Sequence, residues 1–433
     1  MRFKIFILSV LFLIGMTVES FAAYYVRTDG GTPNGAGGTT VCNGQTDAPA
    51  AGNSPNCAFN HPNWSIPANG QPTTWKLPAG DTLYIAGPQD GKGTGVYRMG
   101  CQGTANCLDA TINMTGTTCN PSASYDCGNI VVNSGPNNST RTTIKGCGPS
   151  GCGSNKYPEL WLAGRMDSLF DMTGSSNITW SNLEITDHAA QGHLNECVVG
   201  TTTLCGRQAF KANGGWFNIT HEYLYIHGLT YQAMKIGGQA GGGTDLNWRM
   251  DNVRIEFNAF AGIDTDTCFN AGTCGFKGPV VWRDVTFKWA GCVEPYPIVT
   301  PDTPVANSCR TGETGGYSDA FGGSDSGGNW DIDGITCKFN ASDCLDLLYC
   351  GRTDRSNYGR CTVKVNRMNC EGNAGNCIKG PTDLIITNSK LNGNCAWWST
   401  HTNFYQPGSA MCRDGGRAAN PIAISTNEQS FIG

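Results

Sequence analysis

Charged residues are scarce in this chain of 433 residues. Lysine, arginine, aspartate and glutamate together make up 15% of it, and the formal net charge is −5, whereas an ordinary globular protein is about 25% charged. A net negative chain without a basic run lacks the electrostatic surface that nucleic acid requires. We therefore expect no nucleic-acid partner.

Long apolar runs are absent beyond the N-terminus. The first 22 residues combine a basic start (Arg2, Lys4), an apolar run from Ile5 to Ile14 and the small-x-small ending Ser20-Phe21-Ala22, which is the pattern of a cleaved signal peptide. No later segment approaches the about 18 apolar residues of a membrane span. Residues 1–22 are therefore predicted to be a signal peptide, and the protein is predicted to be secreted to the extracellular space or the periplasm without a membrane span.

Cysteine, by contrast, is abundant. All 22 cysteines follow the predicted signal, from Cys42 to Cys412, and an even number in an exported chain indicates a disulfide framework. Spacings such as Cys101/Cys107 are too wide for zinc knuckles, and only six histidines accompany them. The cysteines are therefore predicted to pair with one another, within local loops or between neighbouring coils, rather than to bind metal.

Helical periodicity is almost absent, and short strand-like phrases recur in its place. They pair alternating apolar residues with an Asn or Asp, and they include "NITWSNLEI" from Asn177, "NITHEYLYI" from Asn218, "VVWRDVTF" from Val280, "NWDIDGIT" from Asn329 and "DLIITNSKL" from Asp383. A variable period of about 20 to 50 residues is typical of a parallel β-helix, in which the strands repeat while the loops vary. A sandwich or propeller would show two-residue hairpin signals or a fixed blade length. Asn residues at the bends are expected to form ladders between coils.

Four further phrases precede these repeats, and they carry a family resemblance. They are "YYVRTDGG" from Tyr24, "LPAGDTLYIAGP" from Leu77, "GVYRM" from Gly95 and "STRTTIKGCGPSG" from Ser139. In this order they resemble the N-terminal cap and first coils of exported right-handed parallel β-helix proteins of the pectate-lyase and chondroitinase type. The resemblance implies an all-β, right-handed parallel β-helix (solenoid) with a Cys/Gly-rich N-terminal cap, in which residues 23–155 form the cap and first coils and residues 156–433 form coils with disulfide-linked loops. A shared fold does not transfer a function, so the site is argued separately.

The coils can be aligned by their phrases. The aligned segments are "YQAMK" from Tyr231, "FAGID" from Phe260, "SDAFG" from Ser318, "SDCLD" from Ser342 and "GNCIK" from Gly375. Their third positions, Ala233, Gly262, Ala320, Cys344 and Cys377, form the small inward column that a stacked solenoid needs. This register also allows a disulfide between Cys344 and Cys377 on adjacent coils.

The same register brings acidic residues together. Asp319 lies above Asp343, and Asp346 follows three positions along the second strand. Stacked carboxylates repel and raise one another's pKa unless a cation neutralises them, and calcium is the cation that prefers such oxygen clusters. Asp319, Asp343 and Asp346 are therefore predicted to bind calcium, and Lys379 occupies the Asp346 column one coil further on.

The resemblance to calcium-dependent pectate lyases implies roles for these residues. Calcium would hold a substrate carboxylate against the acids, Asp343 would belong to the catalytic set, and Lys379 would abstract the proton beside that carboxylate. Arg352, Arg355 and Arg360, in the adjoining loop, would clamp the uronate by bidentate hydrogen bonds. The predicted partner is an extracellular polysaccharide that contains uronate residues.

Other functions remain open. The acids could instead cap turns or hold a structural calcium, or they could serve a glycoside hydrolase, which needs two carboxylates about 5 to 10 Å apart. The protein could also be a non-catalytic adhesin, or a structural protein that self-assembles into filaments through its open coil ends.

Three further groups of residues have weaker patterns. His188, His193, His221 and His227 have no acid or cysteine at metal-like spacing and are expected to hydrogen-bond in loops. The segment "DTDTC", Asp264 to Cys268, is either a second calcium loop or a solvated turn. Trp282, Trp289 and Trp330 either stack on sugar rings or pack beneath loops.

Overall fold

A computed structural model describes most of the chain. The described residues are 22–33, 40–64, 77–88, 94–99, 101–102, 106–107, 130–147, 152, 156–162, 166–188, 206–237, 246–265, 276–295, 303–309, 318–323, 326–347, 350, 361–381, 383–393, 395–404, 420–425 and 431–432. The predicted signal peptide therefore falls outside them, apart from Ala22. Within these ranges, no helix is long and apolar enough to cross a membrane.

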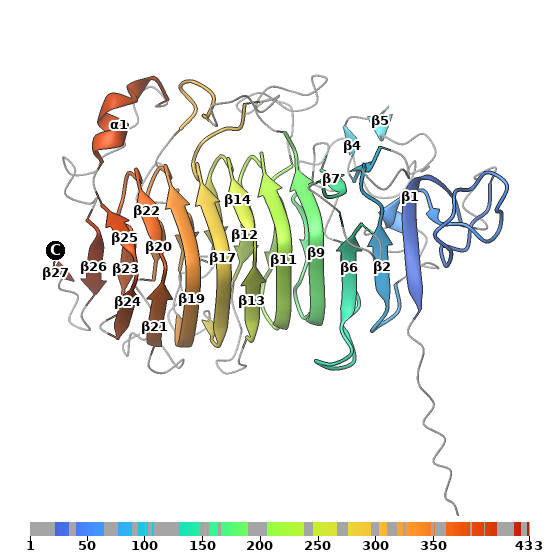
Figure 1. Cartoon of the computed structure of the whole chain (residues 1–433), viewed down its shortest axis with the longest axis horizontal. Helices are drawn as coiled ribbons and strands as arrows, with labels where there is room; N and C mark the ends of the chain where they lie inside the picture. Colours follow the sequence, from blue (N-terminus) through green and yellow to red (C-terminus); the bar gives the residue numbers. More distant parts are fainter. Residues whose placement is uncertain are drawn as a thin grey trace, which may run out of the picture.

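The strands lie side by side along one axis, and their order in space follows their order in the sequence (Figure 1). They form a 16-stranded sheet, a nine-stranded sheet and a two-stranded ribbon. Among the described strands, all pairings in the two large sheets are parallel except the pairing of the last two, β26 and β27. This confirms the prediction of an all-β parallel β-helix, in which each coil lies about 4.8 Å from the next.

The 16-stranded sheet contains a continuous path of ten strands. These are β1 (Ala23–Gly31), β2 (Thr82–Ile85), β6 (Thr142–Gly146), β9 (Ser176–Thr186), β11 (Phe217–His227), β13 (Trp248–Asp251), β17 (Val280–Lys288), β19 (Ser326–Lys338), β21 (Cys361–Asn366) and β24 (Leu384–Thr387). Six shorter strands join this path: β3 (Val96–Arg98), β7 (Glu159–Trp161), β14 (Arg254–Glu256), β16 (Phe276–Lys277), β22 (Asn369–Glu371) and β25 (Lys390–Asn392).

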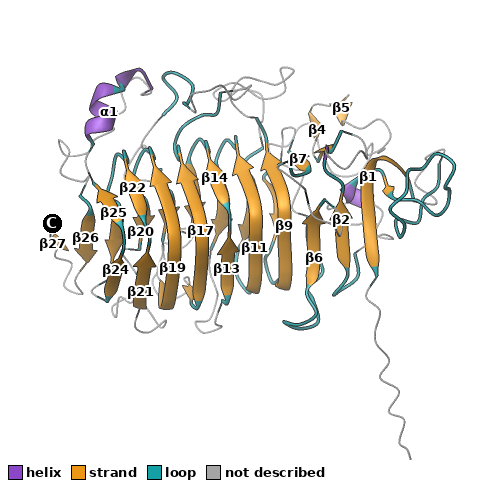
Figure 2. Cartoon of the chain, in the orientation of Figure 1, coloured by secondary structure: helices purple, strands orange, loops and turns teal. Residues whose placement is uncertain are grey.

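The nine-stranded sheet forms another face of the solenoid. Its strands are β8 (Ser168–Asp171), β10 (Gln208–Ala212), β12 (Gln232–Ile236), β15 (Ala261–Asp264), β18 (Phe321–Gly322), β20 (Leu345–Asp346), β23 (Ile378–Gly380), β26 (Ile422–Ser425) and β27 (Phe431–Ile432). The ribbon pairs β4 (Cys101–Gln102) with β5 (Asn106–Cys107). Helix is confined to α1 (Ala396–Thr400) and the short 3-10 turns η1 (Pro62–Trp64) and η4 (Thr402–Phe404) in the described part of the chain (Figure 2).

Residues with positive φ, in the left-handed backbone conformation, form a column at which the long strands bend. Seven residues in register, with φ between 50° and 76°, interrupt the strands at one level: Asn182, Tyr223, Asn252, Asp284, Gly334, Arg367 and Asn388. Asn, Asp and Gly tolerate this conformation better than other residues do. The Asn or Asp that recurs in the sequence phrases therefore marks the bend between two faces of the solenoid.

Aromatic and aliphatic side chains fill the interior. Trp180, His221, Met250 and Trp282 stand in register on successive coils and are buried. Trp180 and His221 stack with ring centroids 5.3 Å apart, and Phe321 of the nine-stranded sheet meets Trp282 edge-on at 5.1 Å. The two sheets therefore share one apolar core.

His221 belongs to this core and not to a loop, which corrects the expectation from sequence. It lies in β11, is fully buried and accepts a hydrogen bond at Nδ1 from Nε1 of Trp248 at 3.2 Å. Burial, aided by the charge of Arg141, lowers the pKa of His221 to about 3. Its ring is therefore a neutral packing element.

The tryptophans proposed to stack on sugars are also part of the packing. Trp282, Trp289 and Trp330 are at most 2% exposed, so their rings do not face a ligand. Trp289 packs outside the main core against Phe257 and Phe339, beneath a loop.

The predicted asparagine ladder is present at another bend. Asn340 and Asn373 are buried on adjacent coils. Oδ1 of Asn373 accepts hydrogen bonds from the backbone N–H of Asn340 at 3.0 Å and from its Nδ2 at 2.8 Å, and Oδ1 of Asn340 accepts one from the N–H of Ala290 at 3.0 Å. The ladder satisfies backbone groups that the bend leaves unpaired.

Disulfides close local segments within coils. Six pairs lie in the described part of the chain, which contains no free cysteine: Cys42–Cys57, Cys147–Cys152, Cys292–Cys309, Cys337–Cys344, Cys350–Cys361 and Cys370–Cys377. The predicted framework is thus confirmed.

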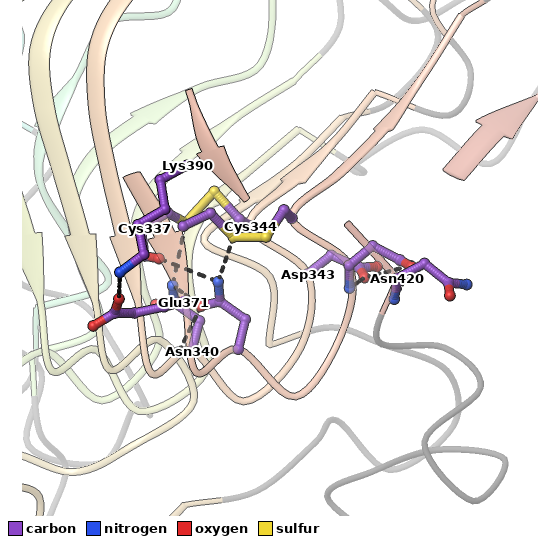
Figure 3. Close-up of a disulfide and its surroundings, with 11 residues drawn as sticks. Cys337, Asn340, Asp343, Cys344, Glu371, Lys390 and Asn420 are labelled. Carbon is purple, nitrogen blue, oxygen red and sulfur yellow. Dashed lines mark hydrogen bonds and ion pairs between the residues drawn. A yellow bond between two sulfur atoms is a disulfide. The ribbon is translucent and has the colours of Figure 1, made fainter. Parts of the chain in front are cut away.

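The pairing of Cys344 with Cys377 is wrong. Cys344 bonds Cys337, and Cys377 bonds Cys370, each seven residues away (Figure 3). The four side chains are buried in the main core, where each pair reaches across the bend of its own coil. The small column itself is confirmed, since Ala233, Ala320, Cys344 and Cys377 are fully buried.

We predict that replacing both Cys337 and Cys344 by alanine lowers the free energy of unfolding by about 2–3 kcal/mol, because the crosslink closes a short loop in the unfolded chain. Urea denaturation measures the loss. The Cys370→Ala/Cys377→Ala variant is the matched control and should lose a similar amount. Peptide mapping of the unreduced parent should recover Cys337 linked to Cys344, and a peptide joining Cys344 to Cys377 would contradict the pairing.

Candidate functional site

The acidic residues singled out by the sequence converge at the nine-stranded sheet. Gly322 of β18, Asp346 of β20 and Lys379 of β23 are paired in register on successive coils. The same register places Asp319 over Asp343, each three residues before that column. The structure therefore has the register predicted from the two Ser-Asp segments, with Asp319 stacked on Asp343.

One oxygen of each stacked acid caps the next coil. Oδ1 of Asp319 accepts the backbone N–H of Asp343 at 2.9 Å, and Oδ1 of Asp343 accepts the N–H and the Nδ2 of Asn376 at 2.5 and 2.9 Å. Asn376 continues the ladder, because its Oδ1 accepts the N–H of Asn420 at 3.0 Å. Figure 3 labels Asp343 and Asn420, which are both members of this ladder. Turn capping, one of the alternatives left open by the sequence, thus accounts for one oxygen of each acid.

Asp343 and Asp346 also face a lysine. Nζ of Lys379 forms an ion pair with Oδ2 of Asp343 and lies 3.1 Å from Oδ2 of Asp346. Asp319 and Asp343 are only 7% and 4% exposed. A Cβ on Gly375 would fall 2.3 Å from Oδ1 of Asp343, so this glycine is required for the carboxylate to sit against the backbone.

The cluster carries more negative charge than Lys379 neutralises. Burial, reinforced by Asp343 and Asp346, raises the pKa of Asp319 well above its usual value. Burial lowers the pKa of Lys379, but the attraction of Asp346, Asp343 and Asp319 outweighs it, so the pKa of this lysine is raised. One oxygen from each acid lies within 4.8 Å of the others. The arrangement can accept a cation, and without one it holds Lys379 firmly protonated.

The other residues proposed from sequence are placed only in part. Arg352, Arg355 and Arg360 lie outside the described residues, as do His193 and the end of the Asp264–Cys268 segment. Asp264 itself accepts a hydrogen bond at Oδ2 from Nε2 of Gln232 at 2.7 Å.

A second cluster of ionisable residues was missed by the sequence reasoning. His188, His227 and Glu294 are buried together, although Glu294 is 67 residues from His227 and no spacing links them. Burial lowers the pKa of both histidines, but adjacent glutamates outweigh it and raise the pKa to about 9 for His188 and about 10 for His227. Burial raises the pKa of Glu294, but the two histidines prevail and lower it to about 2. Both histidines form hydrogen bonds, as expected, and His188 lies outside the strands. His227 lies in β11 and not in a loop, which corrects that part of the expectation.

An aromatic pair lies on the same sheet as the acidic cluster. Tyr231 and Phe260 stack with ring centroids 4.4 Å apart, and the guanidinium of Arg207 lies 4.4 Å from the Tyr231 ring. Both rings are partly exposed, unlike the buried tryptophans.

Comparisons with known proteins assign neither a family nor an activity to the chain. No family model and no curated protein matches the chain. Among solved structures, a rhamnogalacturonan lyase is similar, with 13% sequence identity and a TM-score of 0.37 over 86% of this chain and 76% of the lyase chain. A likeness at this level assigns neither an activity nor site residues to this protein.

We predict that Asp319→Asn raises the Tm of the metal-free protein at pH 7 by about 1–3 °C, the shift that about 1 kcal/mol produces in a chain of this size. Asparagine keeps an oxygen for the N–H of Asp343 and removes a buried negative charge. Because the pKa of Asp319 is raised by folding, its contribution to stability is present below the unfolded pKa near 3.8 and is lost as the pH rises through the folded value.

Thermal melts in chelator at several pH values test this prediction. The difference between variant and parent should shrink as the pH falls toward 4, where the parent carboxyl is protonated. An Asp319→Asn protein that melts below the parent at pH 7 would show that the charge itself is stabilising.

Proposed function

We propose that this protein is an exported, carbohydrate-active β-helix protein that acts as a calcium-dependent lyase on a uronate-containing polysaccharide. The observation that carries the proposal is the convergence of Asp319, Asp343, Asp346 and Lys379 on adjacent coils. Such a concentration of charge is unusual in a chain with only 15% charged residues.

The donor set suits calcium. Three carboxylates offer hard oxygen ligands within 4.8 Å of one another, and calcium accepts six to eight such ligands in flexible geometry. The ladder to Asp343 and Asn376 holds Asp319 and Asp343 in fixed orientations, which reduces the entropy lost on binding. Bound there, calcium would neutralise the carboxylate of a uronate and so acidify the adjoining C–H.

Lys379 is the proposed base, and its surroundings define the condition under which it acts. Its ion pairs with Asp343 and Asp346 raise its pKa, and a protonated lysine cannot take a proton. With a dication on these carboxylates, the attraction that raises the pKa would be lost, the ammonium would be repelled, and it would release its proton to water. The neutral amine of Lys379 could then accept the proton from the carbon beside the uronate carboxylate. The electron pair of that C–H bond forms the new C=C as the glycosidic C–O bond breaks, and the leaving oxygen takes a proton from water.

The same column of the sheet carries further charges toward the N-terminus. On successive coils toward the N-terminus, the residues in register with Asp346 are, in order, Gly322, Asp264, Lys235 and Lys211. Lys235 and Lys211 are partly exposed. A polyanion that runs along the coils from the acidic cluster would therefore meet these two lysines and the nearby pair of Tyr231 and Phe260.

Hydrolysis and pure adhesion are the competing functions. Inverting hydrolases separate their carboxyl groups by about 6.5–9.5 Å and retaining ones by about 5–5.5 Å. Because the oxygens here lie within 4.8 Å of one another, a retaining hydrolase is the nearer competitor. An adhesin would bind the same polymer without cleaving it.

We predict that calcium raises the Tm of the parent protein, in proportion to RT ln(1 + [L]/Kd), and that uronate polymers give the ultraviolet absorbance of an unsaturated sugar. Asp343→Asn should abolish both effects. Lys379→Gln should still bind calcium, since a competing ammonium is gone, but should lose activity by about 10²–10⁴-fold, the usual contribution of a general base.

Lys390→Gln is the matched control, because Lys390 pairs with Glu371 on another strand, and it should behave as the parent does. A calcium-dependent Tm without unsaturated product from any uronate polymer would replace the lyase by an adhesive or structural calcium site. If calcium leaves the Tm of both parent and Asp343→Asn unchanged, the acids serve only as turn caps.

A further inference from the structure

The cluster of His188, His227 and Glu294, here called the histidine–glutamate cluster, joins three separate parts of the chain. His227 ends β11, His188 follows β9 by two residues, and Glu294 lies in the segment after β17. The side chains of His227 and Glu294 are 0% exposed and that of His188 is 9% exposed. Two coils and one loop thus each contribute one side chain to the cluster, and the three side chains can each offer one ligand atom to a metal ion.

The inner atoms have the separation of metal ligands. Nδ1 of His188 lies 3.5 Å from Oε2 of Glu294, and Nδ1 of His227 lies 2.5 Å from Oε1. Oγ1 of Thr186 lies 3.4 Å from both Nδ1 atoms. Tetrahedral zinc, with bonds of about 2.0–2.2 Å, places its ligand atoms about 3.3 Å apart. Three of these four distances are therefore close to those of a formed site, and the contact of 2.5 Å is a hydrogen bond that a metal would replace.

The outer nitrogens have the partners typical of metal-binding histidines. Nε2 of His188 lies 3.1 Å from Oε1 of Glu159, and Nε2 of His227 lies 2.9 Å from Oε1 of Glu184. Metal-ligating histidines generally donate their second N–H to a carboxylate or carbonyl, which fixes the ring and its tautomer. Here both rings are fixed in this way, with Nδ1 directed inward.

Backbone and packing hold the carboxylate of Glu294 in place. Gly228 has φ +62°, and a Cβ there would fall 2.0 Å from Oε2 of Glu294, so only glycine leaves room for this oxygen. In the part of the chain that the structure describes, Oε2 is buried without a hydrogen-bond donor at good distance. A buried carboxylate oxygen that lacks a close donor is costly, and a metal ion would satisfy it.

The charge count is compatible with a bound divalent metal ion. Three glutamates, Glu159, Glu184 and Glu294, surround the two imidazoles. Without a metal, each ring has a carboxylate oxygen beside both nitrogens, so both rings must be protonated to donate, which adds two positive charges. A divalent cation on the inner nitrogens supplies the same two charges while the rings stay neutral.

We propose that the histidine–glutamate cluster is a binding site for a late first-row divalent metal ion, with zinc as the representative ion, ligated by Nδ1 of His188, Nδ1 of His227 and the carboxylate of Glu294. Imidazole with a carboxylate is a ligand set that zinc favours. Thr186 Oγ1 is positioned to contribute the fourth ligand.

This site is separate from the acidic cluster and has a different consequence. Calcium prefers oxygen ligands, so the two sites select different ions. The bound ion ties the segment of Glu294, which the Cys292–Cys309 disulfide also closes, to β9 and β11. The metal is therefore a structural crosslink between a loop and two coils, and this proposal does not rest on the lyase activity.

The experiment uses the full chain, stripped with a chelator and dialysed against zinc. We expect one bound zinc per chain by elemental analysis, a raised Tm, and, on replacement by cobalt, the intense visible bands of a four-coordinate ion. The cobalt spectrum needs no variant, so it tests the site even if a substitution impairs folding.

Matched variants locate the ion. Glu294→Gln and His188→Gln should lower zinc affinity by at least 100-fold. Glu184→Gln, which leaves the ligands intact, should retain the stoichiometry with about 10–100-fold weaker binding. His401→Gln, near α1, removes a histidine elsewhere, and Asp343→Asn removes an acidic-cluster ligand. Both should bind zinc as the parent does.

The proposal is overturned if the stripped parent takes up no zinc, or if cobalt gives only the weak bands of a six-coordinate ion. Equal zinc binding by the parent and Glu294→Gln would also overturn it. In each case the cluster is an ion-paired imidazolium network and not a metal centre.

Discussion

The parallel hydrogen-bond ladder between successive coils is the constraint on which the rest of this structure depends. It sets the residue at each position directly above its counterpart on the next coil, about 4.8 Å away. Each residue therefore has its neighbours along a column set by the register, whether those neighbours are apolar, polar or charged. The core column of Trp180, His221, Met250 and Trp282 and the acidic pair of Asp319 and Asp343 are products of the same rule.

Because of this stacking, a column of buried polar residues destabilises the fold unless its members form hydrogen bonds with one another. Asparagines meet the requirement by ladders, as Asn340 and Asn373 do, because an amide both donates and accepts. Carboxylates only accept, so Asp319 and Asp343 each accept a backbone N–H at one oxygen, and the acids lie close enough for one oxygen of each to fall within 4.8 Å of the others. Burial, reinforced by the neighbouring carboxylates, raises the pKa of Asp319, and Lys379 forms ion pairs with Asp343 and Asp346. The proposed cation site therefore lies where the coils stack acids, whereas the neighbouring bend stacks amides.

The two candidate metal centres arise in different ways. The acidic cluster is formed within the columns of one sheet, from residues on adjacent coils. The histidine–glutamate cluster instead needs a loop, since Glu294 reaches back across the ends of β9 and β11. The first is an extension of the regular register, whereas the second depends on how one loop folds over the coils.

The sequence by itself determined the repeating architecture, because strand phrases, left-handed Asn and Asp residues and small inward positions are local signals that every coil repeats. It also determined the register of Asp319, Asp343, Asp346 and Lys379, since that register follows from aligning short phrases. It did not determine the partner of Cys344, because two cysteines were within reach and only the direction of the side chains around the bend selects Cys337. Nor did it determine where the histidines lie. His221 is a neutral residue of the core, whereas His188 and His227 lie beside Glu294. Those outcomes rest on contacts between residues far apart in the chain, such as His221 with Trp248, 27 positions away, and His227 with Glu294, 67 positions away. Only the tertiary structure brings these residues together, because loop conformation leaves no periodic trace in the sequence.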